Sequence, residues 1–427
     1  MTSSSTRAVI TGVGCVSAFG VGTQALFGAL AEGRSAVGAI RSFDATTFPT
    51  RVAGEVPIAT IDTAWLAPKL GNAALTRELE TSGALRDRKL VFGLIAAAEA
   101  WARAGCGEPE RRGSLVIALG LEQAFLDDFG PIFDGGTIHW DRAASAPGVQ
   151  FRAPVDLCAR EIRRMLALRG PTVVNASACA AGALAVAHAA SLIERGTAEV
   201  VLCGGADSMV NPLGIGGMSR LGAPSPRADA ADACRPFDRH RDGLAIGEGA
   251  AMFVVEDEAR AMARGARVLA RVIGWGSTQD AYRVTAPRPD GAAARAAMER
   301  ALARAKLSPR AIGYINAHGT GTPLNDPAEC RAIRGALGDH AEAVAVSSIK
   351  GAVGHLMAAS GALELAASLL AFERDLLPGT ANLRERDPDC DLDIIGATPR
   401  RARVDAVMSN SFGFGGQNAS VILGRPA

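Results

Sequence analysis

The sequence predicts an α/β protein built from two similar halves. Short apolar, β-branched runs alternate along the chain with longer alanine-rich stretches, which is the pattern of strands alternating with covering helices. Hydrophobic residues make up 48% of the 427 residues, enough for a large core. Each half opens with an apolar strand followed by glycine and a polar loop. We therefore expect mixed α/β halves at 1–255 and 256–427, related by a faint internal repeat.

In the first half, apolar runs bounded by glycine or polar residues predict strands, and longer alanine-rich stretches predict helices. The segment 204–237 is rich in Gly, Pro, Ser and Ala, so we expect a long loop there, of the kind that often forms a lid. The expected strands are 7–12, 115–119, 173–174, 200–203 and 250–255, and the expected helices are 24–33 and the stretch from Cys179 to Arg195.

The second half repeats this alternation. Residues 267–274 form an arginine-flanked apolar run that predicts its first strand. The other expected strands are 313–316, 343–346, 404–408 and 419–423, and the expected helices are 292–305 and 358–372.

Composition excludes several classes of function. The formal net charge is +1 and aromatic residues make up 5%, so neither a global field nor base-stacking aromatics favour nucleic acid. No apolar run is long enough for a membrane span, and residues 1–7 lack signal-peptide character. The eight cysteines show no Cys-x-x-Cys pair and no zinc spacing. We expect a cytoplasmic protein without a metal site and without nucleic-acid or membrane partners.

Cys179 is the strongest candidate for a nucleophile. It follows the predicted strand at 173–174 and precedes a long alanine-rich helix. The helix dipole and the unpaired N–H groups at a helix start both favour thiolate over thiol. A thiolate in this place is a nucleophile, whereas the other seven cysteines are expected to be small buried hydrophobes.

Three further segments place reactive groups after predicted strands. His318 lies in a glycine-threonine loop at 316–323, after the strand expected at 313–316. Lys350 and His355 follow the strand expected at 343–346. A glycine-rich loop at 410–418 joins the last two strands. In α/β sheets, reactive groups gather at the carboxyl ends of strands. Each motif is weak by itself, but a cysteine, two histidines and a lysine in such places form a coherent nucleophilic site.

These motifs together resemble the β-ketoacyl-acyl carrier protein synthases, elongating condensing enzymes of the thiolase superfamily. The resemblance runs from residues 9–14 through the Arg-Pro-Phe-Asp segment at 235–243 to the final loop. It implies a thiolase fold: two pseudo-symmetric halves in an α-β-α-β-α sandwich. It also implies a dimer, identical or mixed, and no cofactor, since phosphopantetheine arrives on the acyl carrier protein.

The resemblance assigns roles by matched position. Cys179 would accept the acyl group, and His318 and His355 would promote decarboxylation. Phe414 would gate the nucleophile and lend its N–H to an oxyanion hole. The remaining matches are a supporting network of Lys350, Asp326, Glu329 and Glu364, and substrate-binding positions at Thr320, Thr322, Asp280, Gly413, Gly415 and Gly416.

Because carrier proteins of this class are acidic, we expect a local basic patch on the surface even though the net charge of the chain is near zero. Arg86, Arg88 and Lys89 fit such a patch, and an ordinary solvated helix face is the alternative. Three positions depart from the family pattern without touching the proposed catalytic atoms: Ala181, Gln417 and Arg283.

The expected reaction joins acyl- and malonyl-carrier protein to give 3-oxoacyl-carrier protein and CO₂. One alternative is the ketosynthase of a type II polyketide or polyene system, paired with a chain-length factor. Another is a non-catalytic chain-length factor, which the presence of Cys179, His318 and His355 disfavours. A degradative thiolase would need a second cysteine near the C-terminus, and the His-Cys-Asn initiation type would need asparagine at position 355.

Overall fold

The computed structural model describes residues 7–58, 61–106, 113–120, 133–134, 137–138 and 157–426. Residues 1–6, on which the signal-peptide expectation largely rests, lie outside this part. Among the described helices, none is long and apolar enough to cross a bilayer.

The first half forms a mixed sheet in the order β8-β5-β9-β10-β1. The neighbouring pairs β1/β10 and β10/β9 are antiparallel, whereas β9, β5 and β8 run parallel. The strands are β1 (Ala8–Ser17), β5 (Ser114–Leu119), β8 (Thr172–Asn175), β9 (Val200–Ser208) and β10 (Ile246–Asp257).

The second half repeats this topology strand for strand. Its order β13-β12-β17-β18-β11 has the same parallel and antiparallel pairs, and β1 joins β11 to link the halves. The internal repeat expected from the sequence is thus present as topology. The strands are β11 (Ala270–Gln279), β12 (Tyr314–Asn316), β13 (Ala345–Ser347), β17 (Ala406–Gly413) and β18 (Gln417–Gly424).

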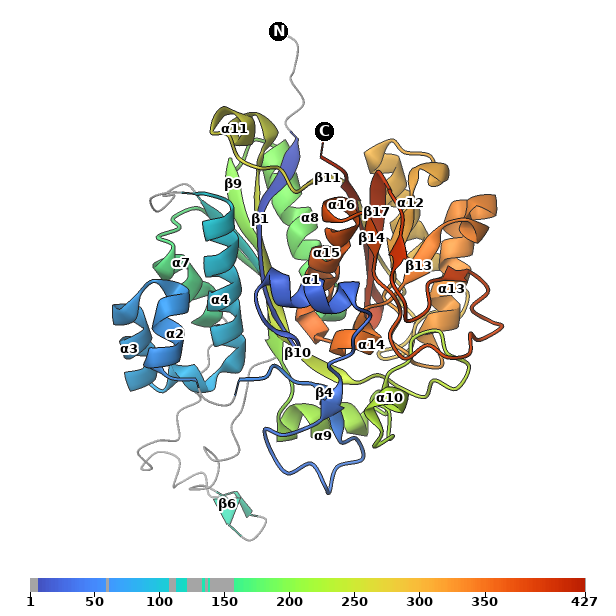
Figure 1. Ribbon diagram of the computed structural model, residues 1–427, viewed down its shortest axis with the longest axis horizontal. Helices are drawn as coiled ribbons and strands as arrows, with labels where there is room; N and C mark the ends of the chain where they lie inside the picture. Colours follow the sequence, from blue (N-terminus) through green and yellow to red (C-terminus); the bar gives the residue numbers. More distant parts are fainter. Residues whose placement is uncertain are drawn as a thin grey trace.

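The helices complete five layers (Figure 1). Helix α4 (Arg88–Arg103) covers one sheet on its outer face, and α12 (Ala292–Ala305) with α13 (Asn325–Leu337) covers the other. Between the sheets lie α8 (Ala181–Glu194) and α15 (Ser360–Ser368), which pack against each other. This is the α-β-α-β-α sandwich that the sequence analysis expected.

Matching glycines let the outer helices approach both sheets. A Cβ on Gly12 or Gly14 of β1 would lie 2.1–2.2 Å from a carbonyl oxygen of α4. A Cβ on Gly274 or Gly276 of β11 would lie 2.1–2.4 Å from a carbonyl oxygen of α12. No real side chain fits such a gap, so glycine sets the spacing in both halves.

The structure describes further, mostly shorter helices and strands beside these layers. The other helices are α1 (Thr23–Ala31), α2 (Thr63–Leu70), α3 (Ala73–Thr81), α7 (Leu157–Met165), α9 (Pro212–Arg220), α10 (Ala230–Ala233), α11 (Glu258–Ala263), α14 (Lys350–Val353) and α16 (Leu370–Glu373). The other strands are β2 (Gly20–Val21), β3 (Gly38–Ala39), β4 (Val52–Gly54), β6 (Phe133–Asp134), β7 (Thr137–Ile138), β14 (Leu376–Leu377), β15 (Asp393–Ile394) and β16 (Arg400–Arg401).

The structure corrects two expectations about elements. The segment 204–237 is not one loop, since it contains the end of β9 and the helices α9 and α10. The helix expected at 358–372 is divided into α15 and α16. The expected division at 255/256 falls two residues before the end of β10, and the second repeat begins at β11.

Candidate active site

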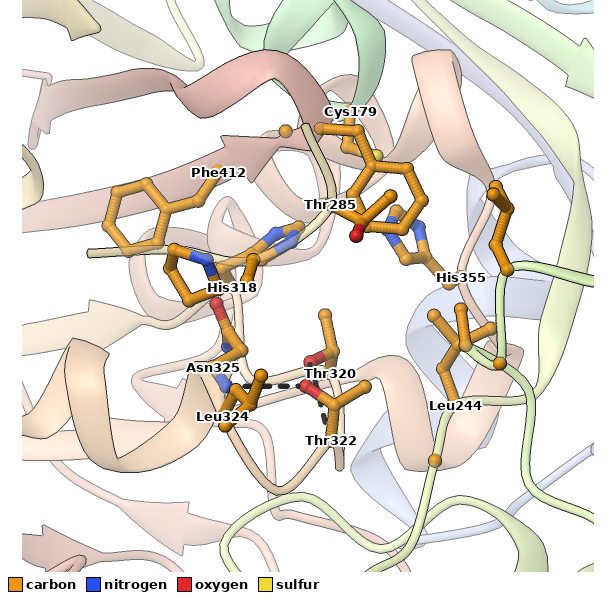
Figure 2. A pocket seen from close by; sticks show the side chains of 18 of the residues that line it. Cys179, Leu244, Thr285, His318, Thr320, Thr322, Leu324, Asn325, His355 and Phe412 are labelled. Carbon is orange, nitrogen blue, oxygen red and sulfur yellow. Dashed lines mark hydrogen bonds between the residues drawn. The ribbon is translucent and has the colours of Figure 1, made fainter. Parts of the chain in front are cut away.

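The four segments singled out from the sequence converge on one cavity of about 340 Å³. Cys179, His318, His355 and Phe414 all line it. Three of them follow the carboxyl ends of β8, β12 and β13, and Phe414 lies in the turn between β17 and β18. Figure 2 shows the two imidazole rings projecting into the space below Cys179.

Cys179 occupies a sharp turn between β8 and α8. It lies in a 3-10 turn, Ala178–Ala180, that directly precedes α8. Ala178 has φ 48°, a left-handed conformation that costs a non-glycine residue free energy and is tolerated at functional turns. A Cβ on Gly413 would lie 2.9 Å from the Cys179 nitrogen, so glycine lets the final loop approach this N–H.

The thiol of Cys179 is less acidic than the sequence suggested. The side chain is only 6% exposed, and burial raises its pKa to about 11. Lys350 and the Phe414 N–H act in the opposite direction but are outweighed. The expectation of a resting thiolate is therefore wrong, because desolvation exceeds the stabilisation by Lys350 and the Phe414 N–H.

This acidity predicts how Cys179 reacts with a small alkylating agent. Below a pKa of about 11 the thiolate fraction rises about tenfold with each pH unit. We expect iodoacetamide labelling of Cys179, followed by peptide mass spectrometry, to accelerate at that rate from about pH 7 to pH 10. A plateau near pH 8 would contradict the assigned acidity, and Cys179→Ala identifies the labelled peptide.

His318 is held by a carboxylate and an ammonium group. Glu329 accepts the backbone N–H groups of His318 and Gly319 at 2.9 and 2.8 Å. Lys350 places its Nζ 3.2 Å from His318 Nδ1 and donates to the His318 carbonyl at 2.6 Å. Because an ammonium group only donates, Nδ1 is the acceptor and Nε2 carries the ring proton.

Lys350 itself is fully buried and forms an ion pair with Glu364. Ser411 donates to the other Glu364 oxygen at 3.3 Å. Burial, then the Lys350 charge and then His355 lower the pKa of His318 well below its usual value. The imidazole is thus neutral at neutral pH, with an N–H available to the cavity.

His355 has the same protonation pattern. The Met357 N–H donates to its Nδ1 at 3.1 Å, so its Nε2 also carries the proton. Burial and then Lys350 lower the pKa of His355 well below its usual value. The two rings stand edge to face with centroids 5.3 Å apart. The cavity is therefore lined by two neutral imidazoles, each with Nε2–H as its free donor.

Asp326 organises the loop that carries Thr320 and Thr322. Its carboxylate accepts the N–H groups of Thr320 and Gly321 at 3.1 and 3.2 Å, and Arg241 Nε lies 3.7 Å away. The two threonine hydroxyls are 2.8 Å apart and both line the cavity (Figure 2).

Asp280 fastens the glycine-rich loop. It accepts from Asn418 Nδ2 at 2.7 Å, and its own N–H donates to the Gly416 carbonyl at 2.8 Å. Gly416 has φ 76°, and a Cβ there would lie 2.7 Å from the Asp280 Cβ. Gly415 is also left-handed, with φ 78°. The loop bearing Gly413 and Phe414 therefore depends on glycine and on Asp280 for its path.

The predicted basic patch is wrong for two of its three residues. Lys89 is 3% exposed, and Arg88 turns inward to the fully buried Glu248, with its Nε 3.1 Å from Oε2. Only Arg86 has an exposed side chain. At the start of α4, Arg88 thus neutralises the buried Glu248 carboxylate and Lys89 is buried, so these two side chains do not add to an exposed basic surface.

Sequence reasoning missed several lining residues. Phe412 stands 5.7 Å from His318 between ring centroids and bounds one side of the cavity (Figure 2). It lies in the glycine-rich run, which was the only available signal. Leu244, Thr285 and Met357 also line the cavity, and nothing local in the sequence marks them.

The fold and site define a class: a thiolase-fold acyltransferase with a cysteine facing two imidazoles. Family models for the β-ketoacyl synthase N-terminal and C-terminal domains match residues 5–261 and 269–384. The chain belongs to the β-ketoacyl synthase family, the condensing enzymes. Its final loop lies beyond the second matched range.

Individual proteins show the same relationship. The chain is 37% identical to a 3-oxoacyl-[acyl-carrier-protein] synthase 2 of Coxiella burnetii, covering 98% of each chain. A type II PKS acyl-carrier protein in complex with its ketosynthase bound to the hexaketide matches with TM-score 0.85 and 28% identity, over 99% of this chain and 100% of that one. The ishigamide ketosynthase/chain length factor matches with TM-score 0.81 and 31% identity, over 99% and 100%.

Proposed function

We propose that the chain condenses an acyl thioester with malonyl-carrier protein, giving 3-oxoacyl-carrier protein and CO₂ through an acyl group on Cys179. The observation that carries this proposal is one cavity with a cysteine and two neutral imidazoles that present Nε2–H. One sulfur can hold the acyl group while two N–H donors face the second substrate.

In the first half-reaction, Cys179 attacks the thioester carbonyl of the acyl-carrier protein. A C–S bond to Cys179 forms, the bond to the pantetheine sulfur breaks, and the thiol proton leaves with the pantetheine sulfur. The developing oxyanion is met by the N–H groups of Cys179 and Phe414, which the close approach of Gly413 brings together.

In the second half-reaction, malonyl thioester loses CO₂ and leaves an enolate. His318 and His355 donate Nε2–H to the enolate oxygen, and being neutral they need no proton transfer to do so. The enolate carbon attacks the acyl carbonyl, and the tetrahedral intermediate collapses by releasing the Cys179 thiolate, which takes a proton from water to regenerate the thiol. These steps use only the thioesters and protein groups, so the proposal includes no metal and no organic cofactor.

The mouth of the cavity supports an acidic carrier protein as the donor. Leu221, Val284 and Leu324 are exposed apolar residues that also line the cavity. Exposed arginines, Arg220 and Arg283, adjoin two of them in sequence. An apolar rim with cationic neighbours suits a carrier that delivers a long pantetheine arm, along which Thr320 and Thr322 offer hydroxyl groups.

Charge reversal at Arg220 tests this docking face. We expect Arg220→Glu to raise KM for malonyl-carrier protein roughly threefold to tenfold and to weaken its salt dependence. The rate with a small malonyl thioester should stay unchanged, because the cavity is intact. Arg310→Glu is the matched control, an exposed arginine that does not line the cavity. Equal KM values for both variants would place the carrier elsewhere.

The edge of the sheet supports a dimer. β8 ends the strand order, all its residues are half-buried, and among the described strands only β5 pairs with it. An unpaired strand edge invites pairing with a second chain. The mass of the purified chain in solution separates a homodimer from a protein that needs a chain-length factor, as in a type II polyketide system.

A further inference from the structure

The hydrogen bonds around His355 involve a residue outside the catalytic set described so far. Ser360, the first residue of α15, is 2% exposed and places its Oγ 2.7 Å from His355 Nδ1. A contact between a hydroxyl and an imidazole nitrogen can run in either direction. Here the direction is fixed, because the Met357 N–H already donates to the same nitrogen. Nδ1 therefore carries no proton, and the Ser360 hydroxyl is the donor.

We infer that Ser360 is a positioning residue, whose hydroxyl locks His355 in the Nε2–H tautomer and fixes the direction of that N–H. The inference rests on the proposed function, because it concerns the donor that the enolate meets. Two donors converging on Nδ1 define the plane of the ring as well as its protonation.

The segment that carries these donors is anchored from the opposite sheet. Asp207 on β9 is buried and accepts the Ala358 N–H at 3.0 Å. Ala358 lies between Met357 and Ser360, so this hydrogen bond fixes the positions of the Met357 N–H and the Ser360 hydroxyl relative to His355 Nδ1. Met357 has φ 47°, a left-handed conformation that such an anchor stabilises.

The ionisable groups around His355 come from five elements. They are His318 after β12, Cys179 before α8, Asp207 on β9, and the ion pair of Lys350 on α14 with Glu364 on α15. Lys350 already disfavours the imidazolium. The Ser360 hydroxyl donates to Nδ1 only when the His355 imidazole is neutral. Its removal therefore destabilises the neutral form and leaves the imidazolium unaffected. The pKa of His355 therefore rises in Ser360→Ala, and activity is lost at a higher pH on the acid side.

The test compares Ser360→Ala and Ser360→Thr with Ser368→Ala in the complete protein. Ser368 is a buried serine two turns further along α15 that donates to a backbone carbonyl at 2.8 Å. CO₂ release from malonyl-carrier protein is measured against pH, and acylation of Cys179 is measured separately by intact-protein mass. We expect Ser360→Ala to lose roughly threefold to tenfold in CO₂ release, with acylation unchanged. Ser360→Thr should restore the wild-type rate of CO₂ release and the wild-type pH at which it is lost on the acid side. Ser368→Ala should match wild type in both.

Burial raises the pKa of Asp207 to about 6, so titration of this carboxylate also affects the activity at acid pH. Because Asp207 is present in every variant, the informative quantity is the difference between variants in the pH at which activity is lost. The assignment would be overturned if Ser360→Ala lost CO₂ release at the same acid pH as wild type. It would also be overturned if the variant lost CO₂ release and acylation to the same extent. Failure of wild-type protein to release CO₂ would instead overturn the proposed function. If Ser360→Ala does not fold, Ser360→Cys replaces it, because a thiol of similar size is a weaker donor and should shift the loss of activity at acid pH in the same direction. The inference requires an unprotonated Nδ1 on His355 across neutral pH.

Discussion

Cys179→Ala is expected to abolish condensation, with a loss of roughly four orders of magnitude or more. Without the sulfur no acyl-enzyme can form, and no other described thiol lines the cavity. The two imidazoles and the backbone donors remain, so malonyl decarboxylation can continue without an acceptor. The measurement is 3-oxoacyl product formed from acyl- and malonyl-carrier protein, together with the mass of the intact enzyme.

Cys203→Ala provides the control for this substitution. Cys203 is a fully buried core residue on β9, so its loss affects packing while the cavity remains unchanged. We expect this variant to condense at the wild-type rate. A stable acylated intermediate on Cys179→Ala would refute the assignment of the nucleophile.

Replacing either imidazole is expected to separate the two half-reactions. His318→Ala and His355→Ala should each slow CO₂ release by a factor on the order of 10²–10³, the usual cost of one oxyanion donor. Acylation of Cys179 should persist, because the proposed donors to its oxyanion are backbone N–H groups, which neither substitution removes. Radiolabelled CO₂ release and intact-protein mass measure the two steps independently.

His188→Ala is the matched control, since His188 is a half-buried residue of α8 outside the cavity lining. Its CO₂ release should equal that of wild type. Normal CO₂ release by His318→Ala or His355→Ala would remove that histidine from the proposed step.

The convergence of the site could be predicted because its parts lie at strand ends. Strand patterns are local, and the carboxyl ends of parallel strands meet at one edge of a sheet. β12 and β13 are parallel neighbours, so His318 and Lys350 had to be close once both strands were recognised. The helix expected at 292–305 has the same bounds as α12, because alanine-rich propensity and packing agree there.

The expectations that proved wrong depend on contacts distant in sequence. α9 is rich in glycine, yet it is helical because Asn211 caps it and Ile215 and Met218 pack into the apolar cluster beside Cys179. Its residues alone favour a loop.

Burial also explains why the expectations about charged and titratable side chains were wrong. Arg88 reads as a surface charge until Glu248, 160 residues away, is placed beside it. The Cys179 thiol has the helix start that the sequence predicted, but the depth of the cavity reverses the effect on its pKa. No sequence pattern marked Ser360, because its role depends on the turn at Met357 that directs His355 back onto α15.

The claim on which this account depends is that Cys179 carries the acyl group which the enolate attacks. Wild-type protein incubated with acyl-carrier protein, digested and mapped by mass spectrometry tests it directly. The account predicts one acyl group, on the peptide containing Cys179, which disappears when malonyl-carrier protein is added and reappears in the 3-oxoacyl product. An acyl group on another residue, or one that malonyl-carrier protein does not discharge, would contradict it.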